Sequence, residues 1–351
     1  MRLHRSAALA AAVFAVCAGV AAAPEYATYD VHPAGSDSSQ IFGMNTVGEA
    51  VGSIARGGVT RAAYWSGPDA APVELGGLGD TLTRAFDING AGEIVGIGTT
   101  AGAFRAIHWQ RFDAAPVQLA DLGLSARANA INDRGEIVGN VAIGTANTLF
   151  PAYWPHADAA PALLATFGGT GGTTDINNRG RIIGTLRDSS NLSQPVFWGD
   201  PTAEPRVLTG VNPSSSPTGI NDRGHIVGRN AVPPGGFEPV FWQWSPADGD
   251  YRPAVGLGSL APDGRGEPAE ISDVGEIVGW SGPVSAAQAT AWRVRTVSDR
   301  GEPAVMTEPP AALAGLGGAF ARPQAVTNAG AIGGESATLA GPAHATFWLT
   351  H

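Results

Sequence analysis

The chain has 351 residues, of which 44% are hydrophobic, so it can bury a sizeable core in one large domain or in two ordinary ones. It contains 49 Gly and 26 Pro but only 15% charged residues, a composition that favours short elements joined by tight turns and therefore an all-β fold. The formal net charge is -10 and there is no Lys, which disfavours nucleic acid and anionic membranes as partners.

Residues 1 to 23 have the layout of a secretory signal peptide. Arg2 and Arg5 precede an apolar run that ends in small residues, and we expect cleavage near Ala22 or Ala23. An uncleaved anchor helix is the alternative, although the apolar run is short for a membrane span. No later stretch is predicted to cross a membrane. We therefore expect a secreted protein, periplasmic or extracellular, that forms a single domain over residues 24 to 351.

The single cysteine, Cys17, lies inside this segment, and the residues before it do not form a lipoprotein cleavage site. The mature chain therefore contains no thiol. Its core alone must hold it together, and disulfides, Cys-based metal sites and thiol redox chemistry are excluded.

One segment is repeated seven times along the mature chain, and its clearest copy is AINDRGEIVG at 130 to 139. A tryptophan follows the closing glycine of every copy at a nearly constant distance. Such a period decides the architecture before any single residue does. The copies occupy residues 42–52, 86–96, 129–139, 174–184, 218–228, 269–279 and 324–334, and the tryptophans are Trp65, Trp109, Trp154, Trp198, Trp242, Trp292 and Trp348.

Each repeat holds four short apolar runs bounded by turn residues, which is typical of a four-stranded antiparallel sheet. Radial repetition of such a sheet gives a β-propeller, so seven repeats predict seven blades. The last repeat stops after its third strand, whereas residues 25 to 31 precede the first repeat and belong to none. We predict that this segment completes the last blade and closes the ring without free edges. A β-solenoid is the structural alternative.

The Asn-Asp-Arg-Gly of the motif predicts a type I turn that ends in a left-handed G1 bulge, and Gly occupies this bulge position in all seven copies. The Asn side chain is expected to bond its own backbone, and Ser272 or Thr327 does so more weakly in two copies. The turn carboxylates Asp133, Asp222 and Asp273 offer too few oxygens for calcium and are interpreted as solvated turn residues. The residue after the turn glycine varies between copies and is expected at an exposed strand start; the acidic examples are Glu49, Glu93, Glu136 and Glu276.

The repeats resemble the HAF-repeat family of bacterial extracellular proteins, whose unit is similar to A-x-x-I-N-x-x-G-x-I-V-G followed by an aromatic-Trp segment. The likeness covers nearly all of the mature chain, although the His-Ala-aromatic triplet of the family is replaced here by segments such as AIHW and PVFW. The resemblance implies an extracellular repeat protein. It supplies no activity to transfer.

Two tryptophans fall outside the repeat pattern. The seven in-register tryptophans are expected to pack between blades, whereas Trp244 and Trp280 are candidates for a surface contact. The spacing also lengthens over residues 243 to 270 and 293 to 325. We expect expanded loops around the fourth strands there, which serve recognition or are simply neutral insertions.

The sharpest site hypothesis comes from comparing the copies five positions before the turn. If the first strand of each repeat is innermost, this position surrounds one mouth of the channel. A basic arc is then predicted that could hold a carboxylate or phosphate through bidentate contacts. Solvated surface arginines are the alternative. The proposed arc consists of Arg84, Arg127, Arg322 and Gln40.

No catalytic or metal-binding motif occurs in the sequence, so no catalytic residue, metal or cofactor is predicted. The favoured function is a secreted, monomeric binding or interaction scaffold for a small anionic ligand, a glycan or a protein. A propeller-type polysaccharide lyase or hydrolase and a structural envelope or matrix component are the alternatives. An enzyme should place two titratable groups of shifted pKa together in a deep pocket.

Overall fold

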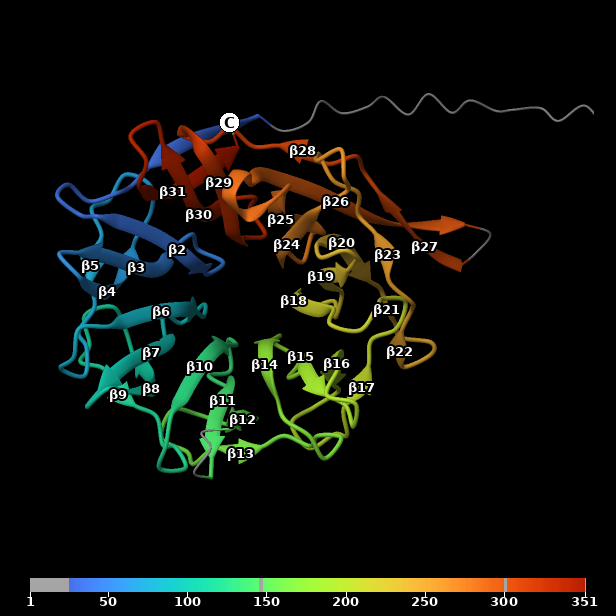
Figure 1. Cartoon of the computed structure of the whole chain (residues 1–351), viewed down its shortest axis with the longest axis horizontal. Coiled ribbons are helices and arrows are strands. Elements are labelled where there is room, and N and C mark those ends of the chain that lie inside the picture. Colours follow the sequence, from blue (N-terminus) through green and yellow to red (C-terminus); the bar gives the residue numbers. More distant parts are fainter. Residues whose placement is uncertain (1–24, 145–147, 300–301, 351) are drawn as a thin grey trace, which may run out of the picture.

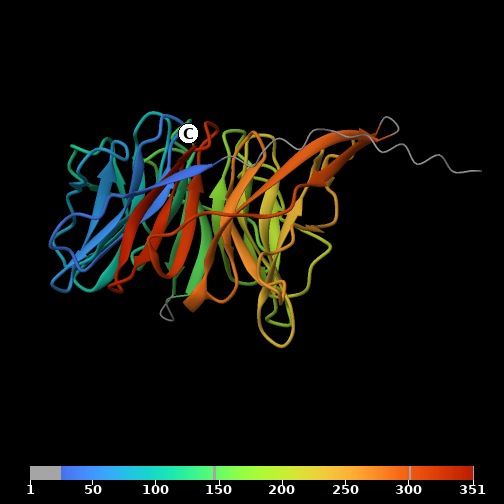
Figure 2. The ribbon, with the colours of Figure 1, turned by 90° about the horizontal axis from the view of Figure 1, so that it is seen from above.

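Seven antiparallel β-sheets are arranged in a ring in the computed structural model, which describes residues 25–144, 148–299 and 302–350 (Figure 1). The fold is therefore a seven-bladed β-propeller, as the repeats predict, and not a solenoid. The predicted signal segment lies outside the described residues. Seen from the side, the strands of the blades run roughly along the channel (Figure 2).

The innermost strand of each blade supplies the channel wall. These strands are β2 (Ser38–Met44), β6 (Thr83–Ile88), β10 (Ala126–Ile131), β14 (Gly171–Ile176), β18 (Ser216–Ile220), β24 (Gly266–Ile271) and β29 (Gly317–Val326). The second strands are β3 (Ala50–Arg56), β7 (Ile94–Thr100), β11 (Ile137–Ile143), β15 (Ile182–Arg187), β19 (Ile226–Ala231), β25 (Glu276–Ser281) and β30 (Ile332–Thr338).

The third and outer strands complete the blades. The third strands are β4 (Val59–Trp65), β8 (Ala103–Trp109), β12 (Thr148–Trp154), β16 (Ser193–Trp198), β20 (Phe237–Trp242), β26 (Gln288–Asp299) and β31 (Ala343–Thr350). The outer strands are β5 (Val73–Glu74), β9 (Val117–Gln118), β13 (Ala162–Leu163), β17 (Arg206–Val207), β23 (Val255–Gly256), β28 (Ala311–Ala312) and β1 (Tyr26–Asp30).

The N-terminal strand closes the ring, as predicted. Strand β1 pairs antiparallel with β31, with Tyr26 opposite Thr350 and Asp30 opposite Thr346. The last blade thus combines the two ends of the described chain, which lie side by side (Figure 1).

The two expanded segments are insertions between a third strand and its outer strand, and they contain paired strands where the sequence predicts loops. In blade five, the short hairpin of β21 (Trp244–Ser245) and β22 (Asp250–Tyr251) precedes β23. In blade six, β26 continues past the blade and pairs with β27 (Glu302–Thr307) to form an arm that projects from the ring (Figures 1 and 2). A short 3-10 helix, η1 (Val284–Ala286), joins β25 to β26.

The repeated turn has the predicted geometry. Gly135, at the bulge position, has φ 75°, and the equivalent glycine of every blade also has positive φ. The Asn132 side-chain oxygen accepts hydrogen bonds from the backbone N–H of Arg134 and of Glu136. The turn residues therefore set the backbone, as their chemistry indicates.

The closing glycine of the motif is required for a different reason. Gly139 pairs with Ala128, beside a β-bulge in β10, and a Cβ placed on it would lie 1.9 Å from the backbone oxygen of Arg127. The same overlap with backbone occurs in all seven blades, which explains why every copy ends in glycine.

The in-register tryptophans form the junctions between blades, as predicted. All seven are at most 2% exposed. The indole N–H of Trp198, for example, donates to the backbone oxygen of Ala165, which follows the outer strand of the preceding blade. The other six make the equivalent bond, so each tryptophan fills apolar space and also satisfies its polar atom.

Candidate functional site

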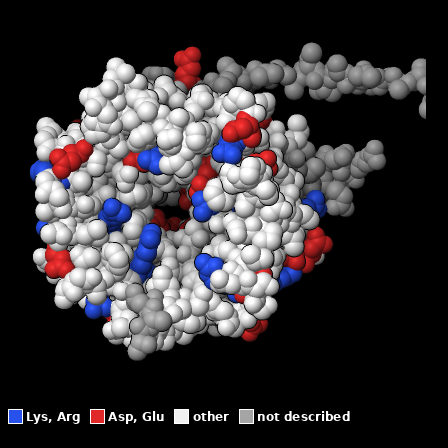
Figure 3. Space-filling view, viewed as in Figure 1, with Lys and Arg blue, Asp and Glu red and all other residues white. Residues whose placement is uncertain are grey.

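The central channel is the candidate site, because residues from all seven blades converge on it. It contains a cavity of about 330 Å³ that is lined by the ends of the inner strands and by the turns that follow them. The space-filling view shows the opening, with basic side chains near its rim and acidic side chains inside (Figure 3). We call the end at the starts of the inner strands the arginine mouth and the end at the repeated turns the turn mouth.

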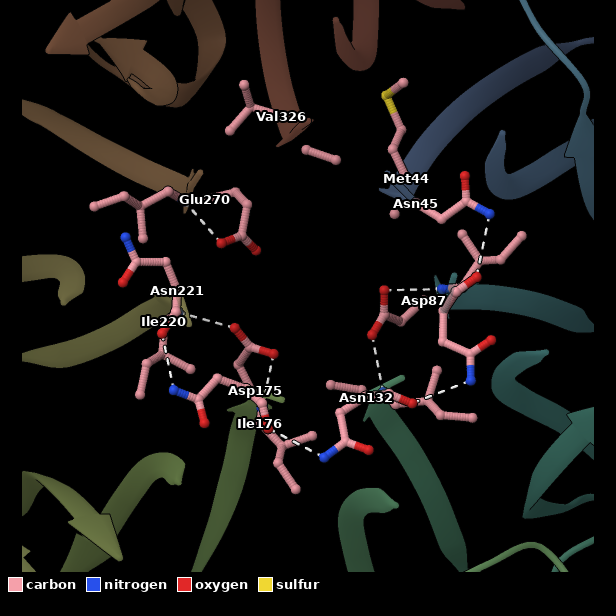
Figure 4. Close-up of a pocket in the computed structure, with 18 of the residues that line it drawn as sticks. Met44, Asn45, Asp87, Asn132, Asp175, Ile176, Ile220, Asn221, Glu270 and Val326 are labelled. Atoms are coloured by element: carbon pink, nitrogen blue, oxygen red, sulfur yellow. Dashed lines mark hydrogen bonds between the residues drawn. The ribbon is translucent and has the colours of Figure 1, made fainter. Parts of the chain in front are cut away.

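Three carboxyl groups on the inner strands line the channel, and they come from alternate blades. Asp87, Asp175 and Glu270 belong to β6, β14 and β24 and are drawn in the close-up (Figure 4). The equivalent residues in the remaining blades have little or no side chain. Space for a carboxylate depends on them, because a Cβ on Gly219 would lie 2.6 Å from Glu270 Oε1. These small residues are Gly43, Ala130, Gly219 and Ala325.

The two aspartates bridge neighbouring blades. Asp87 Oδ1 accepts from the backbone N–H of Ile88 in its own blade at 2.8 Å, and Oδ2 accepts from Ile131 in the next blade at 2.9 Å. Asp175 bonds Ile176 and Ile220 in the same way (Figure 4). Both oxygens of each aspartate are therefore engaged by backbone.

Glu270 differs from the two aspartates. Its Oε1 accepts from the N–H of Ile271 in its own blade, and within the described residues its Oε2 has no hydrogen-bond partner. Glu270 is thus the channel carboxylate with an oxygen available to a ligand.

Burial and mutual repulsion perturb all three groups. Desolvation raises the pKa of Asp87 to about 6. Desolvation, followed by the neighbouring charge of Asp87, raises the pKa of Asp175 to about 7. Burial and the charge of Asp175 raise the pKa of Glu270 well above its usual range. Each carboxyl is partly exposed to the channel, but the protein around it replaces most of its hydration.

The motif search missed these acids because an acidic residue occupies this position in only three of the seven copies. Two positions before the turn residue, the seven repeats read Gly, Asp, Ala, Asp, Gly, Glu and Ala. This alternation of small and acidic residues was the available signal, and a cross-repeat comparison at that position finds it.

The turn mouth is held by a ring of asparagines. The side-chain N–H group of Asn132 donates to the backbone oxygen of Asn177 in the next blade at 3.1 Å, and the same bond links blades one to two through to five to six. Blade-to-blade adhesion is therefore a second role of this residue, beyond the turn geometry predicted for it.

The turn carboxylates are not simply solvated, which corrects the sequence-based interpretation. The Asp133 side chain accepts a hydrogen bond from the backbone N–H of Gly90 in the preceding blade, and the backbone N–H of Asp133 donates to the side-chain oxygen of Asn178 in the next blade. Asp222 and Asp273 continue this chain of bonds around the mouth. The acids occupy these positions because each presents an acceptor to the adjacent turn.

The glutamates after the turn are also not at exposed strand starts. Glu276 is 5% exposed and accepts a hydrogen bond from the Tyr26 hydroxyl. The Glu136 side chain folds beneath its turn, where it accepts from Asn132 at 2.6 Å and from the Tyr153 hydroxyl at 2.8 Å. Sequence variation at this position reflects different local pairings in different blades.

The structure places Arg84 and Arg127 side by side at the arginine mouth. Both side chains are exposed, and neither forms an ion pair or a hydrogen bond with any described residue. The Arg127 guanidinium carbon lies 4.2 Å from the centroid of the Phe86 ring, which lines the channel. Surrounding protein and the charge of Arg84 lower the pKa of Arg127, although a guanidinium remains charged at neutral pH.

The other two members of the predicted arc are neutralised. Arg322 pairs with Glu335 at 2.6 Å, and Gln40 donates to the second oxygen of the same carboxylate. Glu335 itself is 3% exposed. Farther around the mouth, Arg229 pairs with Glu267 at 3.0 Å. The predicted arc thus narrows to two arginines without a counter-ion.

The two off-register tryptophans are not among the residues that line the cavity, and they are only partly exposed. Trp244 packs edge-on against Tyr251, and the guanidinium carbon of Arg181 lies 3.7 Å from its ring centroid. Trp280 lies on β25 opposite Glu267. Their predicted role in a surface contact stays a prediction.

Within the described ranges, no group of three His, Cys, Asp or Glu side chains is arranged to hold a metal ion. The described part of the chain also contains no helix that is long and apolar enough to cross a membrane.

The fold and the channel define the class of protein: a closed seven-bladed β-propeller with a polar central channel. No family model and no curated protein matches the sequence. Solved structures do match in fold, and they include a puromycin hydrolase mutant complexed with PGG, at 15% identity and TM-score 0.57 over 89% of this chain and 54% of that chain. This chain thus spans about half of that protein.

Two further solved structures match over most of both chains. U3-55K is 9% identical, with TM-score 0.57 over 94% of this chain and all of that one. The β-propeller domain of the Trilobed protease from Pyrococcus furiosus is 9% identical, with TM-score 0.54 over 89% of this chain and 94% of that chain. That domain is described as having an open velcro topology, whereas β1 closes the ring here. At these identities the likeness concerns the fold alone.

Proposed function

We propose that the protein is a secreted binding scaffold that recognises an anionic group, a carboxylate or a phosphate, at the arginine mouth of its channel. The observation that carries the proposal is the adjacent pair of guanidinium groups, Arg84 and Arg127, without an acidic partner among the described residues. Guanidinium groups bind carboxylate and phosphate through paired N–H bonds, and two of them at one opening suit a divalent anion.

Secretion and membership of the HAF-repeat family are also part of the proposal. Residues 1 to 23 have the layout of a signal peptide, and the repeats resemble the HAF-repeat family of bacterial extracellular proteins. Both support a protein that works outside the cytoplasm.

An enzyme is expected to place two titratable groups of shifted pKa together in a deep pocket, and Asp175 and Glu270 do have raised pKa values in one channel. Both oxygens of Asp175 and of Asp87 are nevertheless bound by backbone N–H groups, so these carboxyls are poorly placed to exchange a proton with a substrate. Binding is therefore the function that the geometry supports best.

The test uses glutarate and inorganic phosphate as probes in isothermal titration calorimetry of the purified protein. We expect weak binding, with a Kd of roughly a millimolar for such small anions, that is lost in the double variant Arg84→Gln, Arg127→Gln. The matched control, Arg111→Gln with Arg206→Gln, removes two exposed and paired arginines and should leave binding unchanged. Equal binding by both double variants would refute the proposal.

A further inference from the structure

We propose that the channel binds a zwitterionic organic ligand, with its anionic group on Arg84 and Arg127 and its cationic ammonium group inside the channel beside Glu270, Asp87 and Asp175. This inference rests on the proposed function and deepens it, because it names the class of ligand that the same channel takes.

The two charged regions belong to one continuous surface. Arg127 stacks on Phe86, and Phe86 lines the channel next to Asp87 on β6. The Phe42 ring of the preceding blade lies 5.7 Å from the Phe86 ring, so aromatic surface connects the guanidinium groups to the carboxyl groups. The anionic end of an elongated ligand would then meet the guanidinium groups, its apolar chain the aromatic rings and its cationic end the carboxyl groups.

The spacing of the two regions follows from the strand. Arg84 precedes Asp87 by three residues on β6, but a β-bulge lies between them, so that Arg84 is opposite Ile97 and Asp87 is opposite Val95 on β7. This advance of two positions corresponds to about 7 Å along the strand. A single small ion cannot contact both regions. An elongated molecule that carries one charge at each end can do so.

Among the described residues, none that lines the cavity is basic. The cavity lining includes six carboxyl groups and no Arg, Lys or His among the described residues: Asp87, Asp133, Asp175, Asp222, Glu270 and Asp273. Carboxylates that share one cavity without a cation repel one another, and an ammonium group placed among them relieves that repulsion.

The arrangement favours an ammonium group over a metal ion. No three of the described acidic side chains are close enough together to coordinate a metal, whereas an ammonium group forms separate hydrogen bonds to separated acceptors. Glu270 Oε2 is an acceptor of this kind, because the described part of the chain supplies no donor to it.

The unpaired arginines point independently to a ligand at the same channel. The space-filling view shows basic side chains around the opening of the channel and acidic side chains deeper inside it (Figure 3). An anionic group held at the rim therefore directs the remainder of its molecule toward the acids. The charge distribution selects one orientation of a dipolar ligand and disfavours the reverse.

The experiment compares three probes of equal chain length: ε-aminohexanoate, hexanoate and hexylamine, each titrated calorimetrically into the purified protein at pH 8. We expect ε-aminohexanoate to bind at least about fivefold more tightly than either singly charged probe, a difference of roughly 1 kcal/mol. Glu270→Gln should abolish this advantage and leave the affinity for hexanoate unchanged or improved. Glu204→Gln, which alters an exposed glutamate outside the cavity lining, is the control and should preserve the advantage.

The outcomes separate the two proposals. If glutarate binds through the two arginines but ε-aminohexanoate binds no better than hexanoate, the zwitterion inference is wrong and the proposed anion scaffold stands. If hexylamine alone binds, and does so in the arginine double variant, the channel is a cation site and the proposed function is wrong. Because glutamine retains the hydrogen bond to Ile271, a folded Glu270→Gln variant is expected, and its circular dichroism verifies this.

Discussion

Arg127 and Phe86 come from adjacent blades, and the guanidinium carbon lies 4.2 Å from the ring centroid at the arginine mouth. The ring holds the guanidinium plane in place without neutralising its charge, whereas an acidic partner would occupy the N–H groups. Arg322 illustrates the contrast, since Glu335 neutralises it. Stacking thus leaves Arg127 oriented and able to bind an anion.

This relationship makes the guanidinium group itself testable. We expect Arg127→Lys to weaken glutarate binding by about threefold to tenfold, because lysine retains the charge but loses the planar fork and the stacked orientation. Arg111→Lys is a suitable control, since Arg111 also lies over a phenylalanine ring but pairs with Asp113 outside the channel lining. Calorimetric titration of both variants checks this, and full affinity in Arg127→Lys would show that only the charge matters.

The channel acids predict a dependence of stability on pH. Their pKa values are raised in the folded protein, so the stability associated with their protonated forms is complete below the unfolded value near 4 and is lost as the pH rises through about 6 for Asp87 and about 7 for Asp175. No basic side chain lines the described cavity to offset this loss. The acids therefore destabilise the fold at pH 8.

Glu270→Gln tests this effect because it removes one charge and keeps the bond to Ile271. We expect the free energy of unfolding of the variant to exceed that of the parent protein by a margin that grows from pH 5 to pH 8, because burial and the charge of Asp175 raise the pKa of Glu270 in the folded protein. Urea denaturation at both pH values measures the difference. A variant less stable than the parent at pH 8 would mean that the ionised Glu270 forms a favourable interaction.

The closing glycine of the repeat offers a prediction about packing. Gly139→Ala should cost at least about 3 kcal/mol, since its Cβ would overlap the backbone oxygen of Arg127 at 1.9 Å and neither strand can move without breaking a blade. Gly199→Ala is the control, because nothing lies within 4 Å of a Cβ there and its φ is not in the left-handed region. Thermal unfolding should separate the two variants by several degrees.

The sequence specifies the scaffold more completely than the site, for a physical reason. Each blade must satisfy the same local constraints, so Gly135, Gly139 and Trp154 recur in register and the blade number can be counted. Channel residues instead pack against residues of other blades, and these contacts differ from blade to blade. Asp87 therefore has no equivalent acid in the next blade. The neutralisation of Arg322 by Glu335 likewise depends on a contact between β29 and β30 that the repeat pattern does not contain.

The interrupted asparagine ring gives the last prediction. The side-chain amide of Asn221 donates to the backbone oxygen of Ser272 in the next blade at 2.9 Å. The Ser272 hydroxyl accepts the backbone N–H of Glu276, but a serine side chain has no amide group that could donate to the next blade in the same way. In Ser272→Asn the new amide should retain the turn bond and donate to the backbone oxygen of Thr327. We expect the free energy of unfolding to rise by about 1 kcal/mol, the net value of one added hydrogen bond.

The reciprocal change, Asn132→Ser, should cost about 1 to 3 kcal/mol, because it removes the donor to Asn177 and leaves a buried backbone oxygen without that bond. Urea denaturation of both variants measures the pair. Opposite signs would support the ring as a source of blade-to-blade adhesion. Destabilisation by Ser272→Asn combined with no effect of Asn132→Ser would show that the turns are stabilised locally and that the cross-blade bonds contribute nothing.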